Sequence, residues 1–453
     1  MSTPSLTVDF AINPIEYRSV LTAVRRNSLR FVAGTGLVVG YLVYIFFSFN
    51  FGALIEKSRP ERALLLATDA FAYKIHVTKF LRGNTDVSIA VEGERTATYK
   101  TPPDWVVQSG DVTTVDLEDG YSVEVKGNSL TMVVPDVGLI RVMVTTRGVE
   151  TRLPEGIKIP AWLRFSPVKF EARPTIGRRV QVSKSRIEVH RYFLGWENFF
   201  FPFRSELSTY SGWGILKLAF SDRRLQPDMS NLKLIFSTIW YNQEWQHRHV
   251  FIALLETLLM AVLGTFTAAL VGLPLAFLAA TNFTPFPALR FAMRRLFDFL
   301  RGIDMLIWSL IFIRAFGLGP LTGALAIAFT DTGTLGKLFS EALEGADNKQ
   351  MEGVNATGAN RLQFYRFGVI PQIIPIFVSQ GLYYLESNVR SATIIGALGA
   401  GGIGLLLVET MNTQRDWENT LYIIILTICL VMVMDALSSK LRNRLIHGGR
   451  DQS

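Results

Sequence analysis

Long apolar segments alternate with polar stretches along this chain, and the pattern predicts a protein that crosses a membrane several times. A membrane-spanning helix needs roughly 20 apolar residues. The segments that reach or approach this length are residues 31–55, 251–280, 303–318, 321–339, 373–408 and 421–436. The fourth segment is the weakest, because Asp331 and Lys337 interrupt it. We therefore expect six membrane-spanning helices.

A long polar region separates the first two apolar segments. Within it, residues 87–99, 121–134 and 139–146 alternate or are β-branched. Turn residues separate these stretches, as in Glu118-Asp119-Gly120 and Lys126-Gly127-Asn128. This combination predicts a β-rich domain, and no active-site pattern is visible in it.

Aromatic residues crowd the end of that polar region, in residues 192–203 and 232–245. Aromatic side chains of this kind favour the interface between membrane and water. We interpret both segments as interfacial stretches that lead into the second apolar segment. The alternative is that they form part of the core of the β-rich domain.

The basic residues explain the net charge of +8 through membrane topology rather than nucleic-acid binding. They form four groups that flank the apolar segments, and they do not form one patch. If six helices alternate in direction, all four groups lie on the same side of the membrane, which the excess of basic residues marks as cytoplasmic. Both termini are expected on that face, and residues 56–250 on the periplasmic one. The groups are Arg25, Arg26 and Arg30; Arg290, Arg294, Arg295 and Arg301; Lys349, Arg361 and Arg366; and Lys440, Arg442, Arg444 and Arg450.

Candidate chemistry is sparse. The single cysteine, Cys429, excludes a disulfide framework within the chain, and the five histidines suggest no ligand constellation. The glycines at 399–404 fit a dinucleotide fingerprint, but they follow an apolar helix rather than a strand. No Walker A motif occurs. We expect no enzyme activity, no metal and no cofactor, and any ATP hydrolysis would belong to another subunit.

Residues 352–371, EGVNATGANRLQFYRFGVIP, form a polar, basic loop between two apolar segments. The loop has helical character and ends at Pro371, in the first turn of the next expected helix. Because membrane proteins usually keep such connections short, we interpret it as a docking surface for a soluble partner.

Residues 386–404, ESNVRSATIIGALGAGGIG, are the second informative stretch. Glu386 and Arg390 are four residues apart, so on a helix they share a face and can pair. Charges inside an apolar span usually face a pathway or one another, and both possibilities stay open. Asn388 could bind a substrate or pack against a helix. The glycine run that follows predicts a helix break or a close approach of two backbones.

These two stretches resemble permeases of the phosphonate ABC importer family, and the resemblance extends over residues 256–444. It is carried by the loop pattern of Glu352, Gly358 and Ile370-Pro371, by residues 386–404, and by the segments at 256–259, 274–280, 316–320 and 336–342. Gly353 and Val354 replace two alanines of the family pattern, Gly368 replaces an isoleucine, and Asp304 replaces a proline.

The resemblance implies an all-α polytopic membrane protein, similar to type I ABC importer permeases, with a β-rich periplasmic insertion between its first two helices. Its domains would be a cytoplasmic start and first span at 1–55, the insertion at 56–250, a permease domain at 251–445 with a coupling loop at 341–371, and a cytoplasmic tail at 446–453. It assigns ATPase coupling to Glu352, Gly353, Val354, Gly358, Ala359 and Pro371. It assigns the substrate pathway to Arg390, Glu386, Asn388, Gly399, Gly401, Gly402 and Gly404.

The implied partners are a cytoplasmic ABC ATPase dimer, a periplasmic phosphonate-binding protein, a second permease copy and membrane lipid, with no nucleic acid. The implied location is the bacterial inner membrane. Phosphonates are anions, and a guanidinium suits their geometry, which makes Arg390 the leading pathway residue. Phosphate, phosphite or another small solute is an alternative substrate. A passive channel, a secondary carrier or a membrane-anchored sensor are the alternative classes.

Overall fold

The computed structural model describes residues 14–50, 52–53, 60–82, 86–91, 98–157, 159–413 and 417–447, in two compact units, Met1–Leu64 and Leu65–Ser453. The first unit contains α1 (Pro14–Ser48), of which Val24–Ser48 is long and apolar enough to cross a membrane. The first predicted span is therefore confirmed as a helix that begins earlier. Its end at residues 54–55, the chain before residue 14 and the tail beyond 447, with Arg450, lie outside the described residues.

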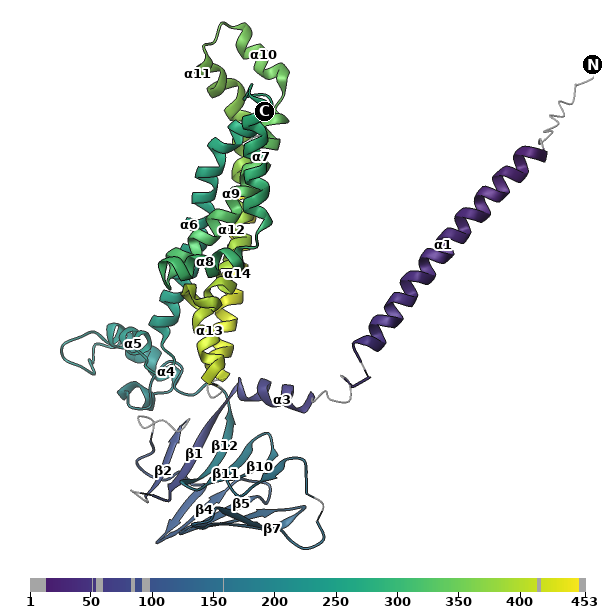
Figure 1. Cartoon of the computed structure of the whole chain (residues 1–453). Helices are drawn as coiled ribbons and strands as arrows, with labels where there is room; N and C mark the ends of the chain where they lie inside the picture. Colours follow the sequence, from purple (N-terminus) through teal and green to yellow (C-terminus); the bar gives the residue numbers. More distant parts are fainter. Residues whose placement is uncertain are drawn as a thin grey trace, which may run out of the picture. The chain divides into compact units, whose positions relative to one another are not determined.

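Helix α3 (Pro60–Asp69) contains the boundary between the two units. The second unit continues from α3 into a β-sandwich of two six-stranded antiparallel sheets (Figure 1). The predicted β-rich region is thus confirmed. One sheet has the order β2-β1-β12-β11-β10-β9 and the other β3-β4-β5-β6-β7-β8. The strands are β1 Ala72–Phe80, β2 Val87–Val91, β3 Val106–Ser109, β4 Val112–Asp116, β5 Ser122–Lys126, β6 Ser129–Val134, β7 Gly138–Val144, β8 Val149–Arg152, β9 Leu163–Phe165, β10 Lys169–Thr175, β11 Arg178–Ser183 and β12 Arg186–Leu194.

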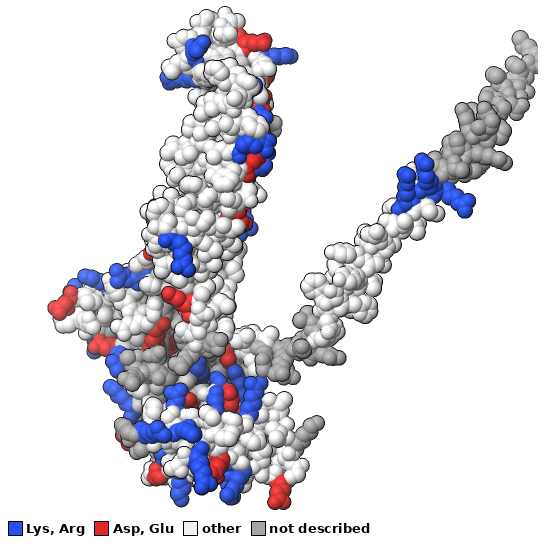
Figure 2. Space-filling view, in the orientation of Figure 1, with Lys and Arg blue, Asp and Glu red and all other residues white. Residues whose placement is uncertain are grey.

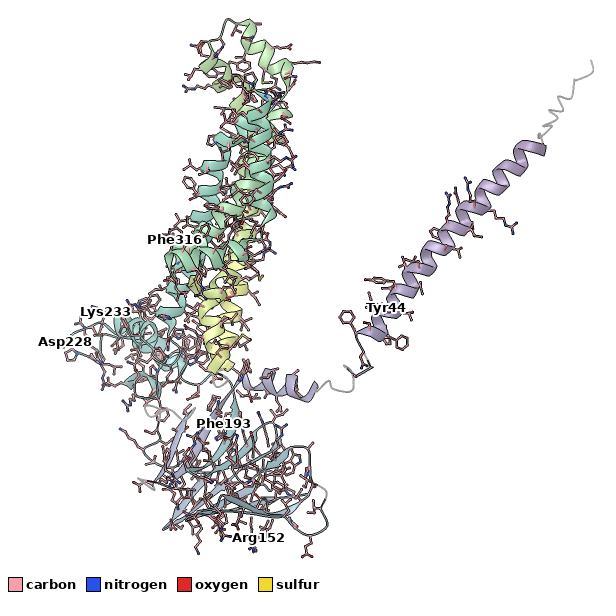
Figure 3. All side chains as sticks on the ribbon, viewed as in Figure 1. Tyr44, Arg152, Phe193, Asp228, Lys233 and Phe316 are labelled. Atoms are coloured by element: carbon pink, nitrogen blue, oxygen red, sulfur yellow. The ribbon has the colours of Figure 1, made fainter. Side chains whose placement is uncertain are left out.

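Alternation of apolar and polar residues produces this sandwich. In β6 and β11, every second side chain is buried between the sheets, as the period of a strand requires. The fully buried side chains include Met132 and Phe170, and Figure 3 shows the side chains of both sheets filling the space between them. The predicted segment 121–134 is a hairpin, because Gly127 turns the chain with a φ of 55° between β5 and β6.

Two short helices, α4 (Gly212–Ala219) and α5 (Asn231–Trp240), connect the sandwich to the helical part. The aromatic residues around these two helices pack in two different places. Phe193 packs on Tyr73 at the end of the sandwich, whereas Trp196 and Trp245 pack against Tyr422 of a helix near the end of the chain. The alternative, a place beside the core of the β-rich domain, therefore holds for Phe193, and the interfacial position of the other aromatic residues stays a prediction.

The rest of the chain forms an elongated helical bundle (Figure 1). Its helices are α6 His247–Ala279, α7 Pro287–Gly302, α8 Met305–Phe316, α9 Pro320–Glu344, α10 Asn348–Ala356, α11 Arg361–Gln363, the π-helix η2 Phe364–Val369, α12 Ile370–Ile395, the π-helix η3 Gly396–Ala400, α13 Gly402–Thr413 and α14 Trp417–His447. Most of the visible bundle surface carries no charge, and charged side chains are concentrated on the sandwich (Figure 2).

The predicted count of six spans is confirmed for four helices, by their length and hydropathy, and stays a prediction for the other two. Four helical stretches of the described chain are long and apolar enough to cross a membrane: Val24–Ser48, His247–Ala279, Arg361–Ala400 and Trp417–Arg444. The third predicted span is the 12-residue α8, about 18 Å long and too short to span a bilayer alone. The fourth is α9, whose polar residues lower its hydropathy although it has 25 residues. The fifth is broken between α12 and α13.

Helix α7 was missed by the hydropathy pattern because it is amphipathic. Arg290 lies in its first turn, Arg294 and Arg295 lie in its middle, and Arg301 lies in its last turn, about 16 Å along the axis from Arg290. That the four arginines of this group lie on the cytoplasmic face stays a prediction.

Glycines allow α6, α7 and α9 to pack closely. A β-carbon on Gly264 of α6 would lie 2.7 Å from the side chain of Ile327 on α9. A β-carbon on Gly336 of α9 would lie 2.4 Å from the ring of Phe297 on α7. Small residues at such contacts are typical of membrane helices, whose association depends on close van der Waals packing.

Candidate functional site

The loop between α9 and α12 is an ordered structure held at both ends. Asp347 caps α10, since its carboxylate accepts a hydrogen bond of 2.9 Å from the backbone N–H of Lys349. The backbone N–H of Asp347 donates to Oε1 of Gln372 on α12 at 2.8 Å. The start of α10 is thereby fixed to the first turn of α12, which belongs to a helical stretch long enough to cross a membrane.

Helix α10 divides the predicted coupling residues between its two faces. Met351 is buried against the bundle, and the side chain of Val354 packs near the backbone of Gly368. Glu352 and Gly353 are exposed on the other face. A β-carbon on Gly368 would lie 3.6 Å from Cα of Met351, so η2 lies directly against α10.

The chain turns sharply after α10. Gly358 has a φ of 78°, a conformation that favours glycine. Asn360 and Gln363 then form a capping box around α11, and Pro371 occupies the first turn of α12, as the sequence indicated. The exposed face carries a shallow hollow, lined in part by Gly353, Val354, Gly358 and Ala359.

The glycine run lies in the half of the bundle nearer the sandwich, where it interrupts the helix between α12 and α13 (Figure 1). Gly399, Gly401 and Gly402 have φ values of 114°, 86° and 70°. The predicted helix break is therefore confirmed, and its cause is a set of backbone angles that other residues rarely adopt.

The predicted close approach of backbones is also confirmed. A β-carbon on Gly404 would lie 1.9 Å from the carbonyl oxygen of Thr393, and one on Gly402 would lie 2.4 Å from Oγ1 of Thr257. The start of α13 therefore packs against the end of α12 and on α6.

Two residues of α6 hold this glycine turn, and the sequence analysis did not assign them a role. The backbone N–H of Gly402 donates to Oε2 of Glu256 at 3.1 Å, and that of Ile403 donates to Oγ1 of Thr257 at 2.9 Å. These side chains supply acceptors for the free N–H groups at the start of α13. An acid followed by a threonine in an otherwise apolar span was the available signal.

The predicted pair of Glu386 and Arg390 is confirmed, with Nη2 of Arg390 3.1 Å from Oε1 of Glu386. Arg442 of α14 also approaches Glu386, at 3.7 Å. The Glu386 side chain is 14% exposed and that of Arg390 is 58% exposed. Glu386 thus lies between two helices, while Arg390 extends from the bundle surface of a single chain.

Asn388 lies in the interior of the bundle and joins three helices. It is 1% exposed, and its Nδ2 donates to Oγ1 of Thr265 on α6 at 2.8 Å and to Oδ2 of Asp331 on α9 at 2.5 Å. Of the two roles left open for Asn388, these contacts support helix packing. From the sequence, Asp331 was predicted only to interrupt a span, and its contact with Asn388 was not predicted.

The β-sandwich contains a cluster that corrects the view of the histidines. The candidate ligand atoms of His76, Glu188 and His190 all lie within 4.8 Å of one another. His76 is far in the sequence from Glu188 and His190, and the three residues meet because β1 pairs with β12. The inference that the histidines form no ligand constellation is therefore wrong.

Residues 272–447 match the family described as "Binding-protein-dependent transport system inner membrane component". The putative phosphite transport system permease protein HtxC of Stutzerimonas stutzeri is 34% identical over 196 residues, which are 43% of this chain and 69% of that protein. The putative cryptic phosphonate transport system permease protein PhnE2 of Escherichia coli is 44% identical over 122 residues, 27% of this chain and 99% of that protein. The phosphate-import permease protein PhnE of Mycolicibacterium smegmatis is 37% identical over 195 residues, 43% of this chain and 36% of that protein.

Proposed function

This chain belongs to the family of binding-protein-dependent transport system inner membrane components, and from that premise we propose that it is the permease subunit of an ATP-driven importer of phosphonates. One observation carries the proposal beyond the family. An ordered, exposed helix, α10, projects from the end of the bundle and is bonded to the first turn of a membrane-long helix. Such a projection suits a soluble ATPase that must move the pathway from outside the membrane.

The ATPase dimer would bind the exposed face of α10 at Glu352 and Gly353, with Gly358 and Ala359 lining the adjacent hollow. Its motion would reach the pathway along two routes. One is the hydrogen bond between Asp347 and Gln372, and the other is the apolar contact of Met351 with the start of α12. Pro371 would keep the first turn of α12 regular, because its fixed φ suits that position.

The pathway would lie on the bundle face that presents Arg390, completed by a second copy of the chain. Phosphonate, phosphite and phosphate are all phosphorus oxyanions, and a guanidinium can bind two of their oxygens at once. Glu386 would orient Arg390 for this contact. The glycine turn at Gly399, Gly401, Gly402 and Gly404 would shape the outer mouth of the pathway.

The proposed topology places the α10 end of the bundle in the cytoplasm, together with both termini. The β-sandwich is then periplasmic, where a phosphonate-binding protein would deliver the substrate. The division into 1–55, 56–250, 251–445 and 446–453 belongs to this proposal. Exposed Trp213 on α4, Phe220 directly after it and Phe236 on α5 fit an interfacial position for the two connecting helices.

The coupling assignment is tested by uptake and ATPase stimulation in proteoliposomes. Glu352→Ala and Gly358→Ala should each abolish both activities while the amount of inserted permease stays constant. Matched controls lie in the sandwich: Glu124 is another exposed acid, and Gly110 is another glycine of positive φ, at 59°, with open space around it. Wild-type uptake by both loop variants would remove the coupling assignment. Uptake that persists without the ATPase would instead indicate a passive channel.

A further inference from the structure

The outer face of one sandwich sheet holds an arrangement of side chains that membrane transport does not explain. His76 of β1 and His190 of β12 are direct partners in the antiparallel register, and their rings stack with centroids 4.1 Å apart. Glu188 precedes His190 by two residues on β12, so its side chain leaves the same face of the sheet. Two imidazoles and a carboxylate therefore converge, with their ligand atoms within 4.8 Å.

The two imidazoles lack the hydrogen bonds that buried rings normally make. His190 is 3% exposed, and among the described residues neither of its ring nitrogens has a hydrogen-bond partner. Nε2 of His76 lacks one in the same part of the structure. Buried polar atoms without partners are rare in folded proteins and call for an explanation, such as a bound ion.

We propose that His76, His190 and Glu188 bind one divalent transition-metal ion of the Zn²⁺ class in the β-sandwich. Two imidazole nitrogens and one carboxylate oxygen form a ligand set that Zn²⁺ accepts, with water as the fourth ligand. Hard cations such as Mg²⁺ and Ca²⁺ prefer sites made of oxygen atoms, so the site should discriminate against them. Within one chain this site is independent of the proposed transport pathway.

The charge state of the rings fits this chemistry. Burial, with a contribution from Lys74, Arg179 and Arg186, lowers the pKa of His76 to about 3. Burial likewise lowers the pKa of His190 well below its usual value. Both rings are therefore neutral at physiological pH and keep a lone pair for a metal ion.

The cluster keeps negative charge close by, although basic side chains surround it. Arg179 pairs with Glu171 at 2.5 Å, and Arg186 pairs with Glu188 at 3.2 Å. A bound ion would have to share Glu188 with Arg186. This competition predicts weaker binding than in a site whose carboxylate has no other partner.

The position of the cluster suggests what the ion would do. β1 is the first strand of the sandwich and β12 is the last, and their pairing closes the domain. The chain leaves β12 toward the aromatic segment that contacts α14. A metal ion between these strands would fasten the first strand of the domain to the last, at the middle of their pairing.

The test uses the full chain, purified in detergent with any histidine tag removed and treated with a chelator. Titration with ZnCl₂ in a calorimeter should show one ion bound per chain, and Co²⁺ should give the visible absorption of a four-coordinate site. His76→Gln and Glu188→Gln should each weaken Zn²⁺ binding by at least about tenfold, since even outer-shell changes cost roughly 10–100-fold. His249→Gln, at an exposed histidine outside the cluster, is the matched control and should bind like the wild type.

Thermal unfolding of the wild type provides a second measurement that no variant can confound. The unfolding temperature should rise with Zn²⁺ and stay constant with Mg²⁺. Failure of the folded wild type to bind Zn²⁺ saturably would overturn the proposal, as would equal binding by folded His76→Gln and Glu188→Gln. The stacked histidines would then be a packing feature of the sheet.

Discussion

Gly404 illustrates how one missing side chain can decide the packing of two helices. Alanine at this position would put its β-carbon 1.9 Å from the carbonyl oxygen of Thr393, so α12 and α13 would have to separate. We expect Gly404→Ala to destabilise the folded state by about 1–3 kcal/mol or more, seen as a lower unfolding temperature in detergent. Gly381→Ala is the control, because that glycine of α12 has open space around it. A Gly404→Ala variant as stable as the control would contradict the close approach.

Arg390 should matter for transport more than for stability. Its side chain is 58% exposed, and an ion pair of this kind contributes only about 0–1 kcal/mol. We therefore expect Arg390→Ala to reduce phosphonate uptake at least tenfold while the membrane level of the protein hardly changes. Arg295→Ala, which removes another exposed and paired arginine of the bundle, should leave uptake intact. Parallel loss of protein and uptake in Arg390→Ala would assign a structural role.

The residue scale also shows what a sequence can and cannot reveal. The pair of Glu386 and Arg390 was predictable, because four residues of helix bring two side chains to one face. The contact of Asn388 with Asp331 was not, because it depends on how two helices rotate relative to each other. The same limit applies to Thr257, whose partner Ile403 is 146 residues away.

At the scale of elements, Asn388 stabilises the packing of α6, α9 and α12 through its two buried hydrogen bonds. Asn388→Leu would leave the Asp331 carboxyl group without this donor. We expect a loss of about 1–3 kcal/mol, the cost of a buried polar group that loses its partner, measured by unfolding in detergent. The double variant Asn388→Leu/Asp331→Leu should recover part of that loss. No recovery would show that the pair contributes through shape alone.

The sandwich sheet should weaken in acid through Glu171 of β10. Burial raises the pKa of Glu171, but Arg179, Lys169 and Gln181 stabilise its charged form and lower the pKa to about 2. Because the folded-state pKa lies below the ordinary value of 4.5, this contribution is complete above pH 4.5 and is lost as the pH falls toward 2. Glu171→Gln should flatten the acid limb of a plot of unfolding temperature against pH. Glu124→Gln, at an exposed acid, should leave that limb unchanged.

Element boundaries were predictable where one strong local signal marks them. Gly399, Gly401 and Gly402 adopt φ values that break a helix, and the glycine run in the sequence predicted that break directly. Helix α7 carries a charged face and an apolar face. Its mean hydropathy is therefore low, and a search for apolar segments does not detect it. Its presence explains why the predicted third span corresponds only to the short α8.

At the scale of the whole molecule, alternating residues predicted the β-rich region, whereas the arrangement of its sheets could not be predicted. β1 pairs with β12, and their partner residues His76 and His190 lie 114 positions apart. Such pairing depends on the topology of the complete domain and leaves no local pattern. The His76–Glu188–His190 cluster stayed hidden for that reason.

Membrane topology is the property on which the proposed mechanism depends most. The docking helix must face the cytosol, where the ATPase is, and the sandwich must face the periplasm. The basic side chains Arg294 and Lys349 lie near the α10 end of the bundle, where Arg294 pairs with Glu344 at the end of α9, and an excess of such residues marks the cytoplasmic side.

Reporter fusions at residues 150 and 355 test this arrangement directly. Alkaline phosphatase is active only outside the cytosol, so it should be active at residue 150, in β8, and inactive at residue 355, in α10. A green fluorescent protein that folds only in the cytosol should give the opposite result at the two positions. The two reporters control for each other, since low expression would silence both. Phosphatase activity at residue 355 would place α10 beyond the reach of a cytosolic ATPase and would exclude the coupling mechanism.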